Sequence, residues 1–417
     1  MFTQRWISKA IVTIVTIVTI LAGLSACAQN SPTNNNTQSQ APIKIGYSVA
    51  LTGQYSQDGK ALQQGFQLWQ EDINKRGGLL GRQVVLDGLD DASNAQQETT
   101  NYQKLIATDH VDLLFGPFSS LLTVPAAVVA HRYNYALLAP TGSAPSVYKK
   151  HFNNIFVVTL PAQNYLKTFA QFILALPQSM RPKTAAYATV DNPFTIPQVT
   201  VAQQQLSAGG IQTVFNSPPY PQTSTDMSGL AQQIINSKPD IVVLGTSALP
   251  DAVSFIKTFK QQHFNPKALI ATAGPDEGSQ FLNAIGGAPS AEGIFIPNPG
   301  WYPGVNNYQN AQFTQEYIAK YGGTADDISA STVEGYSAGQ VLEQAVNKIH
   351  SIDNGKLIQE LHSDTFNSLQ GPIRFGQYGD NTIGVPFLFQ WQSGKLIPVY
   401  PTAQAQANPE YPKKPWP

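Results

Sequence analysis

The chain has 417 residues, and its 25 lysines and arginines nearly balance its 26 aspartates and glutamates, so the formal net charge is −1 at pH 7. This balance excludes the basic surface that nucleic-acid binding requires. A single cysteine, Cys27, excludes a disulfide within the chain, so core packing has to stabilise the fold.

The first 26 residues are predicted to be a lipoprotein signal peptide. Arg5 and Lys9 precede an uncharged run over 10–24, which has the length of a signal-peptide core and is short for a transmembrane helix. The run ends in LSAC, which resembles the bacterial lipoprotein signal, in which the cysteine is acylated and the preceding peptide is removed. We therefore predict that Cys27 is the lipid attachment point. The alternative is a signal peptide or crude anchor with an idle cysteine.

Residues 27–42 are predicted to be a flexible tether, because beyond Cys27 they contain no charge and no aliphatic side chain larger than alanine. Cleavage after residue 26 removes Arg5 and Lys9 and changes the formal charge from −1 to −3. About 360 residues then remain, which is enough for two domains that each have a core.

Beyond the tether, short apolar runs alternate with stretches of helical period. The first series has runs at 43–49, 84–86, 111–115 and 135–138. Between the first two runs, Leu62, Phe66, Trp69 and Ile73 fall on one face of a helix that ends at a Gly-Gly pair. Ser93 followed by Gln96 predicts a capping box for the next helix.

The pattern repeats after Pro161, with apolar runs at 184–189, 211–215, 241–245, 268–271 and 294–296. Continuous apolar strands that alternate with helices indicate parallel sheets covered by helices on both faces. The two series therefore predict an α/β protein with two doubly wound lobes.

The last third is predicted to differ. Residues 306–321 and 331–362 have helical patterns, and 371–376, 387–391 and 396–399 indicate antiparallel strands. The final stretch, 403–417, is rich in proline and alanine and is predicted to be a loosely packed tail.

In an open parallel sheet, ligands bind beyond the carboxyl ends of the strands. Three loops at such ends carry polar residues, at 115–120, 138–145 and 271–278. The first two offer hydroxyl groups and backbone N–H groups that suit a carboxylate. The third offers Asp276 and Glu277, which suit an ammonium group. Taken singly, these serines are also consistent with helix caps and these acids with solvated loop residues.

Residues 43–400 resemble the branched-chain amino-acid receptor group of type I periplasmic binding proteins, also called the Leu/Ile/Val-binding protein family. The matching segments are ALTG at 50–53, DIN at 72–74 with GG at 77–78, DD at 90–91, GPFSS at 116–120, APTGS at 139–143, and GP at 371–372 ahead of Phe375. The resemblance implies two lobes joined by three hinge crossovers, near 157–161, 296–299 and 370–372. We therefore expect 43–160 plus 298–370 to form lobe 1 and 161–297 plus 371–402 to form lobe 2.

The resemblance also implies a set of ligand-binding residues. Ser119 and Ser120 would bind the ligand carboxylate, and Thr141 and Ser143 would share the carboxylate and ammonium groups. Asp276 falls at the family's ammonium-binding acid, with Glu277 as the alternative. Phe194 and Ser247 each fall near a position where these receptors often carry tyrosine, and serine at 247 leaves space for a larger side chain or for water. Asp58 falls where an aromatic is frequent or, alternatively, caps the first helix. These departures predict an altered side-chain pocket.

The sequence offers no catalytic motif, no cofactor motif and no histidine pair with metal-ligand spacing. Asp90 and Asp91 are expected to cap a helix. The resemblance implies a lipid-anchored substrate-binding protein on the periplasmic side of the cytoplasmic membrane, or on the cell surface where no outer membrane exists. It would bind an amino acid or related amide and work with an ABC permease by hinge closure. The alternatives are a ligand-sensing receptor subunit of the same fold and, as a remote third, a lipid-anchored hydrolase.

Overall fold

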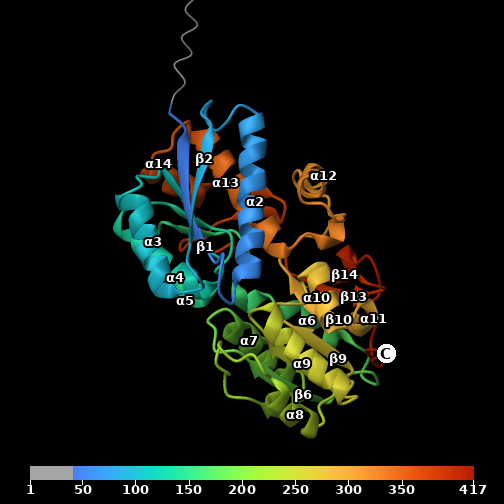
Figure 1. Ribbon diagram of the computed structural model, residues 1–417. Coiled ribbons are helices and arrows are strands. Elements are labelled where there is room, and N and C mark those ends of the chain that lie inside the picture. The colour runs from blue at the N-terminus through green and yellow to red at the C-terminus, as the bar shows by residue number, and fades with distance from the viewer. Residues whose placement is uncertain (1–40) are drawn as a thin grey trace, which may run out of the picture. The chain divides into compact units, whose positions relative to one another are not determined.

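The computed structural model describes residues 41–417, which contain two large β-sheets flanked by helices and one small two-stranded sheet (Figure 1). The predicted signal peptide, Cys27 and nearly all of the predicted tether lie outside the described residues. None of the helices in the described part is long and apolar enough to cross a membrane.

The first lobe is built on a five-stranded sheet with the order β2-β1-β3-β4-β5. Every pair in this sheet is parallel. Its strands are β1 (Ile43–Val49), β2 (Val84–Asp90), β3 (Leu113–Phe115), β4 (Leu137–Ala139) and β5 (Ile155–Val157). All but β2 are buried along most of their length, which explains why they appear in the sequence as continuous apolar runs.

Helices cover both faces of this sheet, as predicted. One face packs against α2 (Ser56–Lys75) and α13 (Ala330–Ile349), and the other packs against α3 (Ala95–Ala107) and α4 (Ser120–Arg132). The lobe also contains α5 (Pro145–Tyr148), α12 (Asn310–Tyr321) and α14 (Asn354–Ser363). The predicted stripe of Leu62, Phe66, Trp69 and Ile73 is buried in this core, so the helical period identified the correct face of α2.

Helices α2 and α13 touch through their backbones. A Cβ atom on Gly65 would lie 2.2 Å from the carbonyl oxygen of Thr332, and one on Gly335 would lie 2.5 Å from that of Leu62. Both distances are too short for any side chain, so glycine at these two positions permits the close crossing. The crossing holds the N-terminal turns of α2 and α13 in a defined relation, and both turns contribute to the site described below.

The second lobe is built on a seven-stranded sheet with the order β14-β13-β10-β9-β8-β6-β7. Its parallel strands are β6 (Thr184–Thr189), β7 (Gln212–Asn216), β8 (Ile241–Gly245), β9 (Ala268–Ala271) and β10 (Ile294–Asn298). The predicted antiparallel strands are β13 (Phe387–Gln392) and β14 (Lys395–Tyr400). Together the two sheets confirm the predicted two-lobed α/β fold.

Both faces of the second sheet are also covered. One face packs against α8 (Ser228–Asn236), α9 (Leu249–Gln261) and α10 (Gly278–Ile285), and the other packs against α6 (Lys167–Ala175) and α7 (Thr195–Ala208). A short helix, α11 (Ala288–Ala291), precedes β10. Alternate residues of β8 point to opposite faces of this sheet. Val242 is buried against α8, α9 and α10, and Val243 is buried against α6 and α7.

One predicted boundary between the lobes is misplaced. The sequence predicted that the second lobe resumes at residue 371, but β12 (Gly371–Arg374) pairs with β11 (Thr365–Ser368) in a separate two-stranded sheet. Ile373 and Phe375 are buried in the core of the first lobe, because the β11–β12 hairpin turns back onto α13. After leaving the second sheet at the end of β10, the chain therefore returns to it only at β13.

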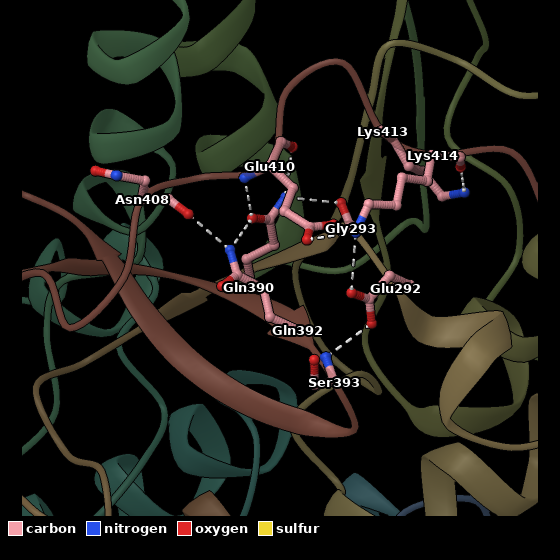
Figure 2. Close-up of polar contacts among 9 residues, drawn as sticks. All are labelled: Glu292, Gly293, Gln390, Gln392, Ser393, Asn408, Glu410, Lys413 and Lys414. Atoms are coloured by element: carbon pink, nitrogen blue, oxygen red, sulfur yellow. Dashed lines mark hydrogen bonds and ion pairs between the residues drawn. The ribbon is translucent and has the colours of Figure 1, made fainter.

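The C-terminal segment is not the loosely packed tail that its composition predicted (Figure 2). The backbone N–H of Glu410 donates to Gln390 Oε1 at 2.7 Å, and Gln390 Nε2 donates back to the carbonyl oxygen of Glu410 at 2.9 Å. Gln392 Nε2 donates to the carbonyl oxygen of Asn408 at 2.9 Å. Lys413 is only 4% exposed. Buried glutamines on β13 thus satisfy a proline-rich backbone that has no regular partner of its own.

Two predictions of the residue that caps α3 are wrong. The N-cap is Asn94 rather than Ser93, and its side chain accepts hydrogen bonds from the N–H groups of Gln96 and Gln97. Asp90 does not cap this helix either, since its carboxylate accepts from the N–H groups of Leu51 and Thr52. Asp90 therefore joins the loops that follow β1 and β2.

Candidate functional site

Residues from both lobes enclose a cavity of about 70 Å³ beyond the carboxyl ends of the strands. Its lining comprises Asp58, Phe118, Thr141, Gly142, Ser143, Thr159, Tyr165, Phe194, Thr272, Ala273, Asp276, Pro297, Asn298, Pro299, Ala330, Ser331 and Glu334. The predicted loops after β3, β4 and β9 all contribute to this lining. Four of the seven predicted ligand-binding residues, Thr141, Ser143, Phe194 and Asp276, meet here.

Hydroxyl groups from the loop after β4 line one part of the cavity. Thr141 Oγ1 accepts a hydrogen bond from the N–H of Ser119 at 3.0 Å and donates to the carbonyl oxygen of Pro117 at 3.0 Å, so it ties two loops together. Ser143 is fully buried, and its Oγ has no hydrogen-bond partner among the described residues. A buried hydroxyl without a partner is costly, so this group is suited to a ligand atom in the cavity.

Ser119 and Ser120 lie beside the cavity but do not line it. Ser120 Oγ accepts a hydrogen bond from the N–H of Ala144 at 3.1 Å, which fixes the loop that carries Ser143. Ser119 stands before α4 with a φ of +74°, and a positive φ is unusual for a serine. Its Oγ is buried and has no partner within residues 41–417.

Ser247 lies away from the other predicted residues. Its N–H donates to Asp251 Oδ2 at 3.1 Å at the start of α9, and it lines a separate hollow together with Gln54 and Gln222. This hollow borders a contact between the lobes, in which the hydroxyl of Tyr55 donates to Gln222 Oε1 at 2.6 Å.

Three carboxyl groups line the cavity from different elements. Asp276 follows β9, and its Oδ1 accepts from the N–H of Gly274 at 2.8 Å. Asp58 lies in the first turn of α2, where Tyr55 is the N-cap, so it lines the cavity and does not cap the helix. Its Oδ1 accepts a weak hydrogen bond from Ser331 Oγ at 3.4 Å. Glu334 enters from the first turns of α13.

Sequence reasoning did not single out Glu334. It lies within a long helical pattern, where an acid is usually solvent-exposed. The one available signal was its spacing of four and seven residues from Ala338 and Val341, which are both buried on the same face of α13. Glu277, the alternative to Asp276, does not line the cavity. It is buried beside Asp58 and accepts from Gln57 Nε2 at 3.5 Å.

Burial raises the pKa of all three lining acids. It raises the pKa of Asp58 and of Asp276 to about 7, and that of Glu334 to about 8. Repulsion between the acids adds to the effect, since Asp276 raises the pKa of both Asp58 and Glu334. No lysine, arginine or histidine lines the cavity. At neutral pH these carboxyl groups are therefore partly protonated. A bound cation would favour their ionised form.

Aromatic side chains form the apolar part of the lining. The rings of Tyr165 and Phe194 meet edge to face, with centroids 5.3 Å apart. The hydroxyl groups of Tyr165 and Thr159 form a hydrogen bond of 2.6 Å, which holds the tyrosine ring in place. Phe118 also lines the cavity, and the centroid of its ring lies 5.6 Å from that of Tyr55. The cavity thus combines hydroxyl groups, carboxyl groups and aromatic faces.

The chain is similar in sequence and in fold to known solute-binding proteins. The chain is 26% identical over 384 residues to Leu/Ile/Val-binding protein homolog 7 of Brucella melitensis, which covers 88% of this chain and 93% of that protein. A solute-binding protein of R. palustris in complex with benzoate has a TM-score of 0.76 at 19% identity, covering 90% of this chain and 98% of its own. A leucine-binding protein of Thermotoga maritima has a TM-score of 0.74 at 20% identity, covering 85% and 97%.

These structural neighbours establish the fold, and a family model identifies the protein. The model described as periplasmic binding protein matches residues 42–395, which is most of the chain. The chain therefore belongs to the periplasmic binding protein family and has the type I fold of its Leu/Ile/Val-binding members.

Proposed function

We propose that this protein is the substrate-binding protein of an ABC transporter and captures a small amino-acid-like solute between its two lobes. The observation that supports this proposal is the composition of the cavity. Ser143 offers a buried hydroxyl group without a partner, and Asp276 offers a partly buried carboxyl group. A zwitterion carries the two complementary groups, a carboxylate and an ammonium.

Closure of the lobes would follow from the division of the site. Thr141, Ser143 and Asp58 belong to the first lobe, whereas Asp276 and Phe194 belong to the second. A ligand that contacts both sets stabilises the closed form more than the open form, and only such differential binding shifts the equilibrium between them. The closed form is what a permease in the membrane would recognise, and the function proposed here involves no catalysis.

The benzoate complex of the R. palustris protein raises the question of an aromatic acid as ligand. A bare carboxylate of this kind would meet three lining carboxyl groups and no cationic side chain in the present cavity. An ammonium-bearing solute avoids that mismatch, because charge-assisted hydrogen bonds then form with the acids. The cavity therefore supports an amino acid over a simple aromatic acid.

A thermal-shift panel of amino acids, short amides, urea and aromatic carboxylates tests the proposal. A ligand at one hundred times its Kd stabilises the folded state by about 2.7 kcal/mol, which corresponds to about 3 °C in Tm for a chain of this size. We expect an amino acid to produce this shift and Ser143→Ala to reduce it. A shift by benzoate alone, or by none of the panel, would contradict the proposed ligand class.

Lipid anchoring through Cys27 is a further part of the proposal and rests on the LSAC segment alone. If Cys27 is acylated, the protein expressed in a bacterium incorporates labelled palmitate and sediments with the membranes. Cys27→Ser is expected to abolish the label and to release the chain from the membrane fraction. A Cys27→Ser protein that remains with the membranes would show that the apolar run at 10–24 acts as the anchor.

A further inference from the structure

Carboxyl groups from both lobes gather around one cavity. Asp58 and Glu334 come from the first lobe, on the two helices that cross at Gly65 and Gly335. Asp276 comes from the second lobe, and Glu277 lies behind it against Asp58. The crossing of α2 and α13 permits little relative movement, so Asp58 and Glu334 face the second lobe as a fixed pair.

This number of acids exceeds what one ammonium group needs. Asp276 alone supplies a carboxylate for an α-ammonium group, as expected from its place after β9. Asp58 and Glu334 then remain buried without a cationic partner in the described chain. Buried carboxylates without a counter-charge are costly, and they either take up protons or bind a cation.

The acids also oppose closure of the lobes in the absence of a cation. Asp276 in the second lobe acts electrostatically on Asp58 and Glu334 in the first, and Asp58 acts on Glu277. Bringing the lobes together therefore either brings like charges together or forces the acids to take up protons. A ligand with positive charge on both sides removes this repulsion only in the closed form, which is the condition for a ligand to drive closure.

Two independent observations point to an organic ligand. Ser143 is fully buried at the cavity, and its Oγ has no partner within residues 41–417, which suits the carboxylate of an amino acid. In the same part of the chain, no group of three or more His, Cys, Asp or Glu side chains is arranged to hold a metal ion. Asp58, Glu334 and Asp276 enter the cavity from α2, α13 and the loop after β9, so they can contact separate cationic centres on a ligand.

On the basis of the proposed function, we infer that the preferred solute is an α-amino acid whose side chain carries a second positive charge. Ser143 binds its carboxylate, Asp276 binds its α-ammonium group, and Asp58 and Glu334 bind the side-chain cation.

Isothermal titration with lysine and norleucine tests this inference, because the two differ by the terminal ammonium group at similar chain length. The purified protein, stripped of bound solute, is expected to bind lysine about tenfold or more tightly than norleucine. Asp58→Asn is expected to reduce this ratio towards one, and Glu334→Gln provides a second variant in case the first does not fold. Asp87→Asn, on the edge strand β2 and outside the cavity lining, is the matched control and keeps the ratio.

The outcomes separate this inference from the function on which it rests. If norleucine or leucine binds as tightly as lysine, the second cationic site is refuted while the amino-acid receptor stands. If lysine is preferred but neither Asp58→Asn nor Glu334→Gln changes the ratio, these two residues are refuted as the site. If no amino acid binds, both the inference and the proposed function fail.

Discussion

Asp276→Asn is expected to weaken binding of the amino-acid ligand by about 30- to 100-fold, or about 2–3 kcal/mol. The substitution removes the charge that we propose pairs with the ligand ammonium group. It keeps an oxygen that can accept from the N–H of Gly274, so the loop after β9 retains its shape. Titration calorimetry on the wild type and the variant measures the difference directly.

Glu277→Gln is the matched comparison for this prediction, because the sequence could not decide between the two acids. Asp276 lines the cavity, whereas Glu277 is buried behind it next to Asp58. We therefore expect the larger loss for Asp276→Asn. The reverse order would show that Glu277 binds the ammonium group and that the loop shifts by one residue on ligand binding.

The ligand-free protein is expected to lose stability as the pH rises from about 5 to about 8. Burial raises the pKa of Asp58 and Asp276 to about 7 and that of Glu334 to about 8, whereas these groups titrate near pH 4 in an unfolded chain. Between these values the folded state holds protons that the unfolded state has released, so stability falls with rising pH. One such acid accounts for on the order of 4 kcal/mol over the full interval.

Other titratable groups also contribute to the dependence of folding stability on pH. The pKa is also raised in buried acids that do not line the cavity, namely Asp72, Asp91, Glu98, Asp251 and Glu277. Lys413 acts in the opposite direction, because burial lowers its pKa to about 7 and the folded state then gains stability as the pH rises beyond that value. The fall attributable to the cavity is therefore best isolated by a variant.

Chemical denaturation of the wild type and Asp58→Asn at pH 5, 6.5 and 8 tests this prediction. Asparagine cannot ionise, so the variant is expected to lose less stability between pH 5 and pH 8 than the wild type. A saturating cationic ligand is expected to reduce the fall as well, because it favours the ionised acids. Identical pH profiles for the two proteins would show that Asp58 does not stay buried in the ligand-free protein.

The sequence predicted much of the fold because that information is local. The stripe from Leu62 to Ile73 marks the buried face of α2, and the continuous apolar run at β8 marks a strand buried on both faces. The sequence did not predict correctly where lobe 1 ends or how the C-terminal segment packs. Ile373 is buried through the β11–β12 hairpin, and the tail is held by Gln390, and neither contact leaves a periodic pattern in the sequence.

The sequence by itself determined the two-lobed α/β fold and the family, and it singled out the loops after β3, β4 and β9, which line the cavity. Only the tertiary structure showed that Glu334 and Asp58 join Asp276 at one cavity and that Ser119, Ser120 and Ser247 do not line it. The reason is that hydrophobic periodicity and loop position reflect neighbours along the chain, whereas the cavity depends on a helix crossing at Gly65 and Gly335, which are 270 residues apart.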